Sequence, residues 1–168
     1  SPSIPNVGFA LLYEETTGTV MLTKYPDRTN APASMTKVMT ALLAIELGDP
    51  ESRVTCSKNA YGVPGTSIYL QQGETLTLEQ MLYGLMLASG NDAAVAIAEH
   101  IGGTVEDFVA LMNARAREIG ANDTRFANPH GLPDDGHYTT AYDLALIARE
   151  AMKNGTFRRI VSTRSAAI

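Results

Sequence analysis

The pattern of apolar and polar positions in the first part of the chain is that of β-strands. Residues 7–13 form a continuous apolar run, and residues 19–24 alternate between polar and apolar side chains. The turn residues Thr16-Thr17-Gly18 lie between them. The pattern therefore predicts an antiparallel hairpin over residues 6–25.

A helical period replaces this pattern from Ser34 onward. Residues 34–47 carry apolar side chains around most of the helix circumference, which predicts a central, buried helix that ends before Gly48 and Pro50. The elements expected after it are short strands at 52–57 and 66–70, and helices that begin at Thr77, near Asn91, at Thr104 and at Thr140.

The order of these elements indicates the fold class. Strands come first and helices dominate afterwards, without regular alternation of the two. This order predicts an α+β fold in which a helical subdomain, over about residues 77–155, is attached to an antiparallel sheet. Residues 122–138 are expected to form an irregular loop, and the pattern leaves residues 157–168 undecided.

Composition restricts the partners of the chain. The net charge is -5, so no basic field is available to attract phosphates, and nucleic acid is not expected as a partner. Cys56 is the only cysteine, which excludes an internal disulfide, and we expect it half-buried in a strand. No apolar run approaches the roughly 20 residues that span a bilayer.

Ser34 and Lys37 are the first candidate catalytic residues. At this spacing on a helix the serine oxygen and the lysine amine share one face. A lysine can take the serine proton only as the neutral amine, and burial lowers a lysine pKa toward that state. Because Ser34 is expected at the helix start, the helix dipole would favour negative charge there. The same two residues also fit a helix cap followed by a solvated lysine.

Ser89-Gly90-Asn91 is the second candidate motif. The glycine permits a tight turn between two apolar helices, and such a turn can direct a hydroxyl and a carboxamide into one cleft. Ser89 could relay a proton to the leaving amine, and Asn91 could hydrogen-bond Lys37 and a substrate amide. An ordinary helix–helix corner has the same composition.

The two motifs occur in the order found in serine acyltransferases. Residues 33–40 (ASMTKVMT) resemble the A-S-[LM]-T-K-[IVL]-M-T box of low-molecular-mass penicillin-binding proteins, the serine-type D-alanyl-D-alanine carboxypeptidases of the S11 peptidase family. Residues 89–93 match that family's S-G-N-D-A. Residues 126–132 and 137–145 resemble its F-x-N-P-x-G-L…Y-[ST]-[ST]-A-x-D-[LM]-A segment.

The resemblance implies a β-lactamase/transpeptidase-like fold and a set of roles. Ser34 would form an acyl-enzyme with a peptidoglycan stem pentapeptide ending in D-Ala-D-Ala, or with a penicillin. Lys37 would be the general base, Ser89 a further catalytic residue and Asn91 a substrate-binding residue. The backbone N–H of Ser34 would be one oxyanion donor. No cofactor or metal is implied, and the location would be extracytoplasmic.

One feature of the family pattern is missing. The third motif, K-[TS]-G, does not occur, and the only lysine after Lys58 is Lys153, which Asn154-Gly155 follows. We therefore expect residues 1–168 to be the N-terminal part of a catalytic domain that lacks its C-terminal strands. Alone, it would catalyse little. Membrane contact would come only through a segment that is not in this sequence.

Two alternatives remain open at this point. A class A β-lactamase shares S-x-x-K and S-x-N but needs a glutamate in an E-x-x-L-N string, and none follows Asn91. A non-catalytic β-lactam sensor or cell-wall binding module would keep Ser34 without releasing D-alanine. His100, His130 and His137 lack the spacing of a zinc site, so structural or surface roles are expected for them.

Overall fold

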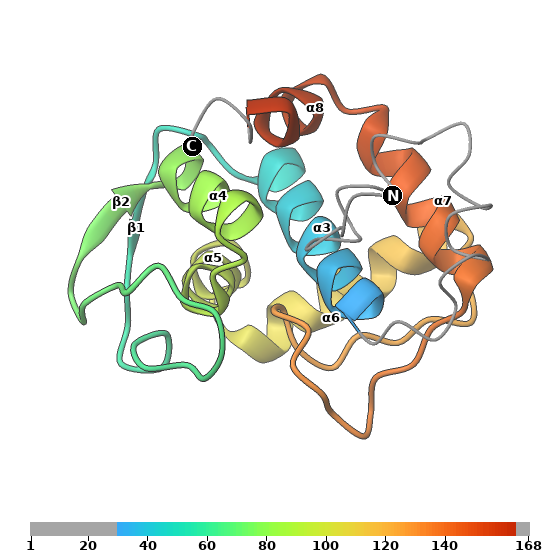
Figure 1. Ribbon diagram of the computed structural model, residues 1–168, viewed down its shortest axis with the longest axis horizontal. Coiled ribbons are helices and arrows are strands. Elements are labelled where there is room, and N and C mark those ends of the chain that lie inside the picture. Colours follow the sequence, from blue (N-terminus) through green and yellow to red (C-terminus); the bar gives the residue numbers. More distant parts are fainter. Residues whose placement is uncertain (1–29, 164–168) are drawn as a thin grey trace, which may run out of the picture.

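Helix α3 (Asn30–Leu47) runs through the middle of the computed structural model, which describes residues 30–163. Every other helix of this described part packs against it (Figure 1). All residues from 35 to 44 are buried, including the polar Thr36, Lys37 and Thr40. The prediction of a central, buried helix is therefore confirmed. The predicted hairpin over 6–25 lies outside the described residues.

The start of α3 differs from the prediction. The helix begins at Asn30, four residues before Ser34. Pro32 is compatible with this start because the first four N–H groups of a helix have no partner within the helix, so a missing N–H has no effect there. Ser34 consequently follows the first turn instead of capping the helix, and the predicted start at Ser34 is wrong.

A two-stranded antiparallel sheet lies at one edge of the described part. Strand β1 (Arg53–Thr55) falls within the predicted strand at 52–57, and it pairs with β2 (Thr75–Thr77), with Val54 opposite Leu76. Cys56, which follows β1, is fully buried and not half-buried as expected.

The strand predicted at 66–70 is wrong. This stretch has no regular secondary structure. The N–H groups of Ile68 and Leu70 donate to the carboxylate of Asp92 instead of to a neighbouring strand. Tyr69 between them has a φ of 60°, in the left-handed region, which is incompatible with a pleated strand.

The capping residues predicted for the later helices are confirmed. Thr77 and Gln80 form the expected capping box of α4, and the side chains of Thr104 and Thr140 cap α6 and α7. The stretch that the pattern left undecided begins inside a helix capped by Asn154. The bounds are α4 (Leu78–Leu87), α5 (Asn91–Gly102), α6 (Val105–Ile119), α7 (Ala141–Met152) and α8 (Gly155–Ser162).

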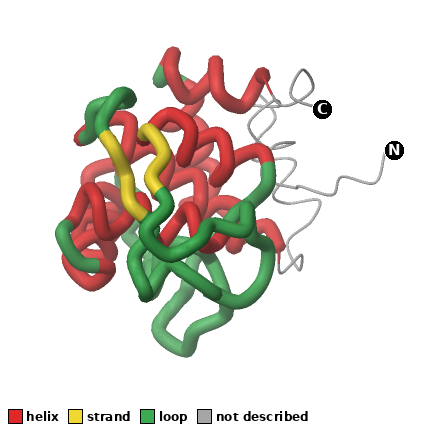
Figure 2. The backbone as a smooth tube through the Cα atoms, turned by 90° about the vertical axis from the view of Figure 1, so that its left-hand side faces the viewer, coloured by secondary structure: helices red, strands yellow, loops and turns green. Residues whose placement is uncertain are grey.

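The helices surround α3, and the long loops gather at one end of the molecule. Helices α4 and α5 lie on one side of α3, and α7 lies on the other (Figure 1). The loops that precede β2 and α7 approach each other, since a Cβ atom on Gly65 would lie 3.6 Å from Cδ2 of Leu132, and loop segments occupy the lower part of the view in Figure 2. Among the described residues, no helix is both long and apolar enough to cross a bilayer. That residues 1–168 form one incomplete domain stays a prediction.

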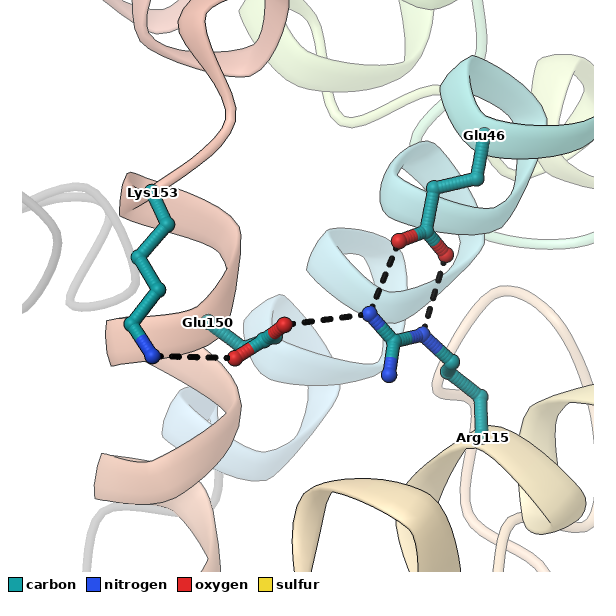
Figure 3. A network of polar contacts seen from close by, with 4 residues as sticks. All are labelled: Glu46, Arg115, Glu150 and Lys153. Atoms are coloured by element: carbon teal, nitrogen blue, oxygen red, sulfur yellow. Dashed lines mark hydrogen bonds and ion pairs between the residues drawn. The ribbon is translucent and has the colours of Figure 1, made fainter.

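A charged network joins three of the helices near the far end of α3. The guanidinium of Arg115 on α6 donates two hydrogen bonds to Glu46, at 3.0 and 2.8 Å, and one to Glu150 on α7, at 3.1 Å (Figure 3). Lys153 lies 3.4 Å from the other oxygen of Glu150. The hydrogen bonds that Arg115 donates to Glu46 and Glu150 hold the pKa of Arg115 above its ordinary value despite partial burial. The bidentate pair with Glu46 therefore fixes α6 against α3, and the single bond to Glu150 joins α7 to α6.

We expect Arg115→Met to lower the free energy of unfolding by about 1–2 kcal/mol, because it removes three charge-assisted hydrogen bonds while retaining the apolar stem. The measurement is urea denaturation at low salt. Arg159→Met is the matched control, since its pair with Glu79 is 3.3 Å long and both side chains are 44% or more exposed. Its effect is expected below about 0.5 kcal/mol. Equal losses in the two variants would contradict the role given to Arg115.

Candidate active site

Ser34 and Lys37 lie at the beginning of α3, next to the loop-rich end of the molecule. Ser34 is partly exposed, whereas the Lys37 side chain is buried among apolar residues, with 8% of the residue exposed. Burial lowers the pKa of Lys37 from 10.5 to about 8. A substantial fraction of Lys37 is therefore the neutral amine in mildly alkaline solution, as a general base requires.

The expected contribution of the helix end to Ser34 is weaker than the sequence suggested. The unpaired N–H groups of a helix are its first four, and the field of the dipole falls off within the first turn. Because α3 begins at Asn30, Ser34 is the fifth residue of the helix. The prediction that its N–H is an oxyanion donor rests on the family resemblance and stays a prediction.

A tight turn at residues 128–132 lies against the first turns of α3. Gly131 has a φ of 92°, and a Cβ atom added there would lie 2.6 Å from the Cα of Ala33. Only glycine permits this approach. One turn beyond Lys37, the buried hydroxyl of Thr40 donates to the carbonyl of Pro129 at 2.7 Å. These contacts fix the turn beside Ser34 and Lys37.

Asn128 organises the turn internally. Its side-chain oxygen Oδ1 accepts from the N–H groups of His130 and Gly131, at 3.2 and 2.7 Å. Its side-chain amide nitrogen donates to the carbonyl of Leu132 at 2.9 Å. These bonds give the loop a rigid tip although it has no regular secondary structure there.

His130 is part of this turn and lies near Lys37. Its Nδ1 accepts a hydrogen bond from the N–H of Leu132 at 3.1 Å, so the ring proton is on Nε2. Burial, and secondly the positive charge of Lys37, lower the pKa of His130 to about 4. His130 is therefore neutral at any pH at which Lys37 is beginning to lose its proton.

The Ser89–Asn91 corner joins α4 to α5, and both of these helices pack against α3. Ser89 has a φ of 54°, which is uncommon for a residue other than glycine. The amide of Asn91 is buried and donates to the carbonyl of Pro64 at 2.8 Å. Its oxygen Oδ1 is buried and accepts no hydrogen bond from the described residues. Such an acceptor is available to a substrate amide or an ammonium group.

Gly65 connects the corner to the turn. A Cβ atom on Gly65 would lie 2.5 Å from Nδ2 of Asn91 and 3.6 Å from Cδ2 of Leu132. The corner and the 128–132 turn therefore both lie next to Gly65. The 128–132 turn also lies next to Ser34 and Lys37. Residues from four separate parts of the sequence meet at this end of α3, and all four residues assigned to the site lie on the segments that meet.

Several contacts at the site had not been predicted. The carboxylate of Asp92 and the bond between Thr40 and Pro129 join segments that are distant in the sequence. Asp92 had two signals in the sequence, its place in the S-G-N-D-A motif and its position in a first helical turn, but neither indicated which segment it would contact.

The structural or surface roles expected for the histidines stay a prediction, and two of them make the following contacts. His100 near the end of α5 contacts the hydroxyl of Ser52 at 2.9 Å. The ring of His137 packs at 5.9 Å from that of Phe126, and burial lowers the pKa of His137 in spite of the Arg125 carbonyl and Asp134, which act in the opposite direction.

The chain is similar in sequence to a known family of proteins. A family model described as D-alanyl-D-alanine carboxypeptidase matches residues 4–167. The D-alanyl-D-alanine carboxypeptidase DacF of Bacillus subtilis is 43% identical over 159 residues, which cover 92% of this chain and 41% of that protein. The D-alanyl-D-alanine carboxypeptidase of Streptomyces sp. K15 is 36% identical over 176 residues, 98% of this chain and 60% of that protein. The chain thus spans about two fifths to three fifths of these relatives.

Solved structures agree with the sequence relatives. A D-alanyl-D-alanine carboxypeptidase from Mycobacterium tuberculosis matches 77% of this chain and 49% of its own, with a TM-score of 0.72 and 39% identity. The Streptomyces K15 DD-transpeptidase matches 76% and 53%, with a TM-score of 0.70 and 37% identity. The predicted α+β, transpeptidase-like fold is therefore confirmed, and the chain belongs to the D-alanyl-D-alanine carboxypeptidase family, peptidase family S11.

Proposed function

We propose that the protein to which this chain belongs removes the terminal D-alanine from peptidoglycan stem pentapeptides through an acyl-enzyme on Ser34. The observation that carries the proposal is the buried Lys37, with its pKa lowered to about 8, one helical turn after Ser34. At pH 7 about a tenth of such a lysine is neutral, which is enough to act as a base.

The proposed reaction has two steps. The Oγ of Ser34 attacks the carbonyl carbon of the penultimate D-alanine, and its proton passes to Nζ of Lys37. The C–N bond then breaks, and the amine of the terminal D-alanine takes up a proton as it leaves. Water attacks the resulting ester, which releases the shortened peptide and restores the Ser34 hydroxyl.

Ser89 and Asn91 complete the proposal. The hydroxyl of Ser89 would pass the proton from Lys37 to the leaving amine. The free Oδ1 of Asn91 would accept either from the Lys37 ammonium or from a substrate amide, because its Nδ2 already donates to the carbonyl of Pro64. Filling this buried acceptor on substrate binding would remove a desolvation penalty of about 1–3 kcal/mol.

The same site would be acylated by β-lactams, whose strained amide takes the place of the D-Ala-D-Ala bond. Peptidoglycan lies outside the cytoplasmic membrane, so the proposed substrate places the enzyme in an extracytoplasmic location. Within the described residues the proposal uses no cofactor and no metal.

We expect Ser34→Ala, made in the full-length protein, to abolish labelling by fluorescent penicillin and release of D-alanine from a pentapeptide, because no other side chain would form the ester. Thr163→Ala, at the end of α8, is a control expected to label like the wild type. Labelling that persists in Ser34→Ala would contradict the proposal. Binding without D-alanine release in the wild type would favour a sensor, and rapid penicillin turnover would favour a β-lactamase.

The second-order rate constant for penicillin acylation should rise with pH and level off above about 8, because only neutral Lys37 accepts the Ser34 proton. Stopped-flow measurements between pH 5 and pH 10 test this expectation. Lys37→Arg keeps the charge but has no accessible neutral form, so it should lose acylation over the whole range. A profile without an ascending limb would exclude Lys37 as the base.

Lys37 should also reduce stability, because its folded-state pKa of about 8 lies below the ordinary value of 10.5. The penalty is complete below pH 8 and disappears as the pH rises beyond 10.5, where both states are neutral. We expect Lys37→Met to raise the free energy of unfolding at pH 7 by about 1–3 kcal/mol. Urea denaturation at pH 7 and pH 10 should show the gain shrinking at the higher pH. An unstable variant at pH 7 would contradict this expectation.

A further inference from the structure

The segment Pro64–Leu70 is bound along its whole length to the Ser89–Asn91 corner and to Asp92. The carbonyl of Thr66 accepts from the N–H of Asn91 at 2.8 Å, and the Thr66 hydroxyl donates to the carbonyl of Ser89. The carbonyl of Pro64 holds the amide of Asn91. Ser89 and Asn91, the two candidate site residues on this corner, are therefore both hydrogen-bonded to the 64–70 segment.

Asp92 binds the second half of the same segment. Its carboxylate accepts from the N–H of Ile68 at 3.1 Å, from the N–H of Leu70 at 3.0 Å and from the hydroxyl of Ser67 at 2.8 Å. A fourth bond comes from the N–H of Ala93 at 3.0 Å. Only 1% of Asp92 is exposed, so bulk water does not reach these donors as an alternative acceptor, and losing the carboxylate would leave them without a partner.

The charge of this carboxylate is maintained by its partners. Burial by itself would raise the pKa of Asp92, but the hydrogen bonds from Leu70, Ile68, Ser67 and Ala93 outweigh it and hold the pKa below its ordinary value. Asp92 is therefore an anion at every pH at which Lys37 could act as a base. Neither Ser34 nor Lys37 is bonded to Asp92, so its role is not direct proton transfer.

Backbone strain occurs both in the 64–70 segment and in the Ser89–Asn91 corner to which it is bound. Among the described residues, Tyr69 and Ser89 are the two residues other than glycine with a positive φ, at 60° and 54°. The residues on either side of Tyr69, Ile68 and Leu70, are both bonded to Asp92. The N–H of Tyr69 itself donates to the hydroxyl of Ser67 at 2.8 Å. Such conformations persist only where the surroundings enforce them.

Two glycines allow the close approach of the segment. A Cβ atom on Gly84 would lie 2.8 Å from Cδ1 of Ile68. A Cβ atom on Gly90 would lie 3.0 Å from Oδ1 of Asp92 and 3.1 Å from Cγ2 of Ile68. The glycine of the S-G-N corner therefore provides the space in which Ile68 and Asp92 meet.

We propose that Asp92 is a positioning residue for acyl transfer, because it clamps the 64–70 segment onto the corner and so fixes Ser89 and Asn91. The proposal rests on the proposed function of the site. It assigns Asp92 no contact with the substrate. Without the clamp, the strained backbone of Ser89 relaxes and the amide of Asn91 loses its fixed orientation.

Asp92→Asn in the full-length protein tests the proposal. The variant keeps the size of the side chain but replaces an acceptor by an NH₂ group that faces N–H donors. We expect the second-order rate constant for penicillin acylation to fall about 10- to 100-fold, the effect of a displacement of about 1 Å in an active site. The ascending limb of its pH profile should keep its midpoint, because Lys37 lies on α3 and its burial is unchanged.

Arg115→Met is the control for general loss of stability. Its partner Glu46 lies twelve residues from Ser34 along α3, a distance of about 18 Å. At a temperature where all proteins are folded by circular dichroism, this variant should acylate within about twofold of the wild type. Acylation of Asp92→Asn within threefold of the wild type, or an equal loss in Arg115→Met, would overturn the proposal.

Thr66→Val tests the same interface from its other side and serves if Asp92→Asn does not fold. It removes the bond to the Ser89 carbonyl with little change in volume. We expect Thr66→Val to lower the second-order rate constant for acylation about three- to tenfold relative to the wild type. Added to Asp92→Asn, it should lower the rate constant by a smaller factor, because both changes weaken the same contact between the segment and the corner. A rate within twofold of the wild type in Thr66→Val would overturn the proposal. Failure of the wild type itself to be labelled would instead refute the proposed function.

Discussion

Burial of α3 on all sides is the constraint on which the rest of the structure depends. Residues 35–44 of α3 are enclosed by the five other helices and have no exposed face for polar side chains, yet Thr36, Lys37 and Thr40 lie among them. The consequences differ with the group. The Thr40 hydroxyl donates to the Pro129 carbonyl and thereby fixes the 128–132 turn against α3. Lys37 has its pKa lowered by desolvation. The packing of α3 thus produces both a wall of the candidate site and the lowered lysine pKa that the proposed base requires.

The helices could be predicted because their signals are local. Thr77, Thr104 and Thr140 each cap the helix that the sequence assigned to them, since a cap depends on residues within one turn. The 66–70 stretch misled the prediction for the opposite reason. Its alternating apolar residues do face the core, but its backbone donors bond to Asp92, more than twenty residues away, and no local pattern contains that information.

The candidate site likewise has features that the sequence predicted and features that it could not predict. Ser34, Lys37, Ser89 and Asn91 were found from short motifs whose spacing carries chemistry. The environment of these residues could not be found in that way. The neutral state of His130 depends on burial and on Lys37, and the position of Gly131 depends on its approach to Ala33. Motifs identify reactive groups, while the pKa values and orientations of those groups arise from contacts between segments.

Unfavourable features are concentrated around the site. Ser89 and Tyr69 have strained backbones, Asn91 has a buried acceptor without a partner among the described residues, and Lys37 is a desolvated amine. Each is unfavourable for folding by itself, and all four lie on segments that meet at one end of α3. The hydrogen bonds to Asp92 and the bond from Thr40 to Pro129 are favourable contacts among the same segments. In the proposed function, a site held in this way would already be oriented before the substrate binds, so the strain of the free protein would serve the orientation of the reacting groups.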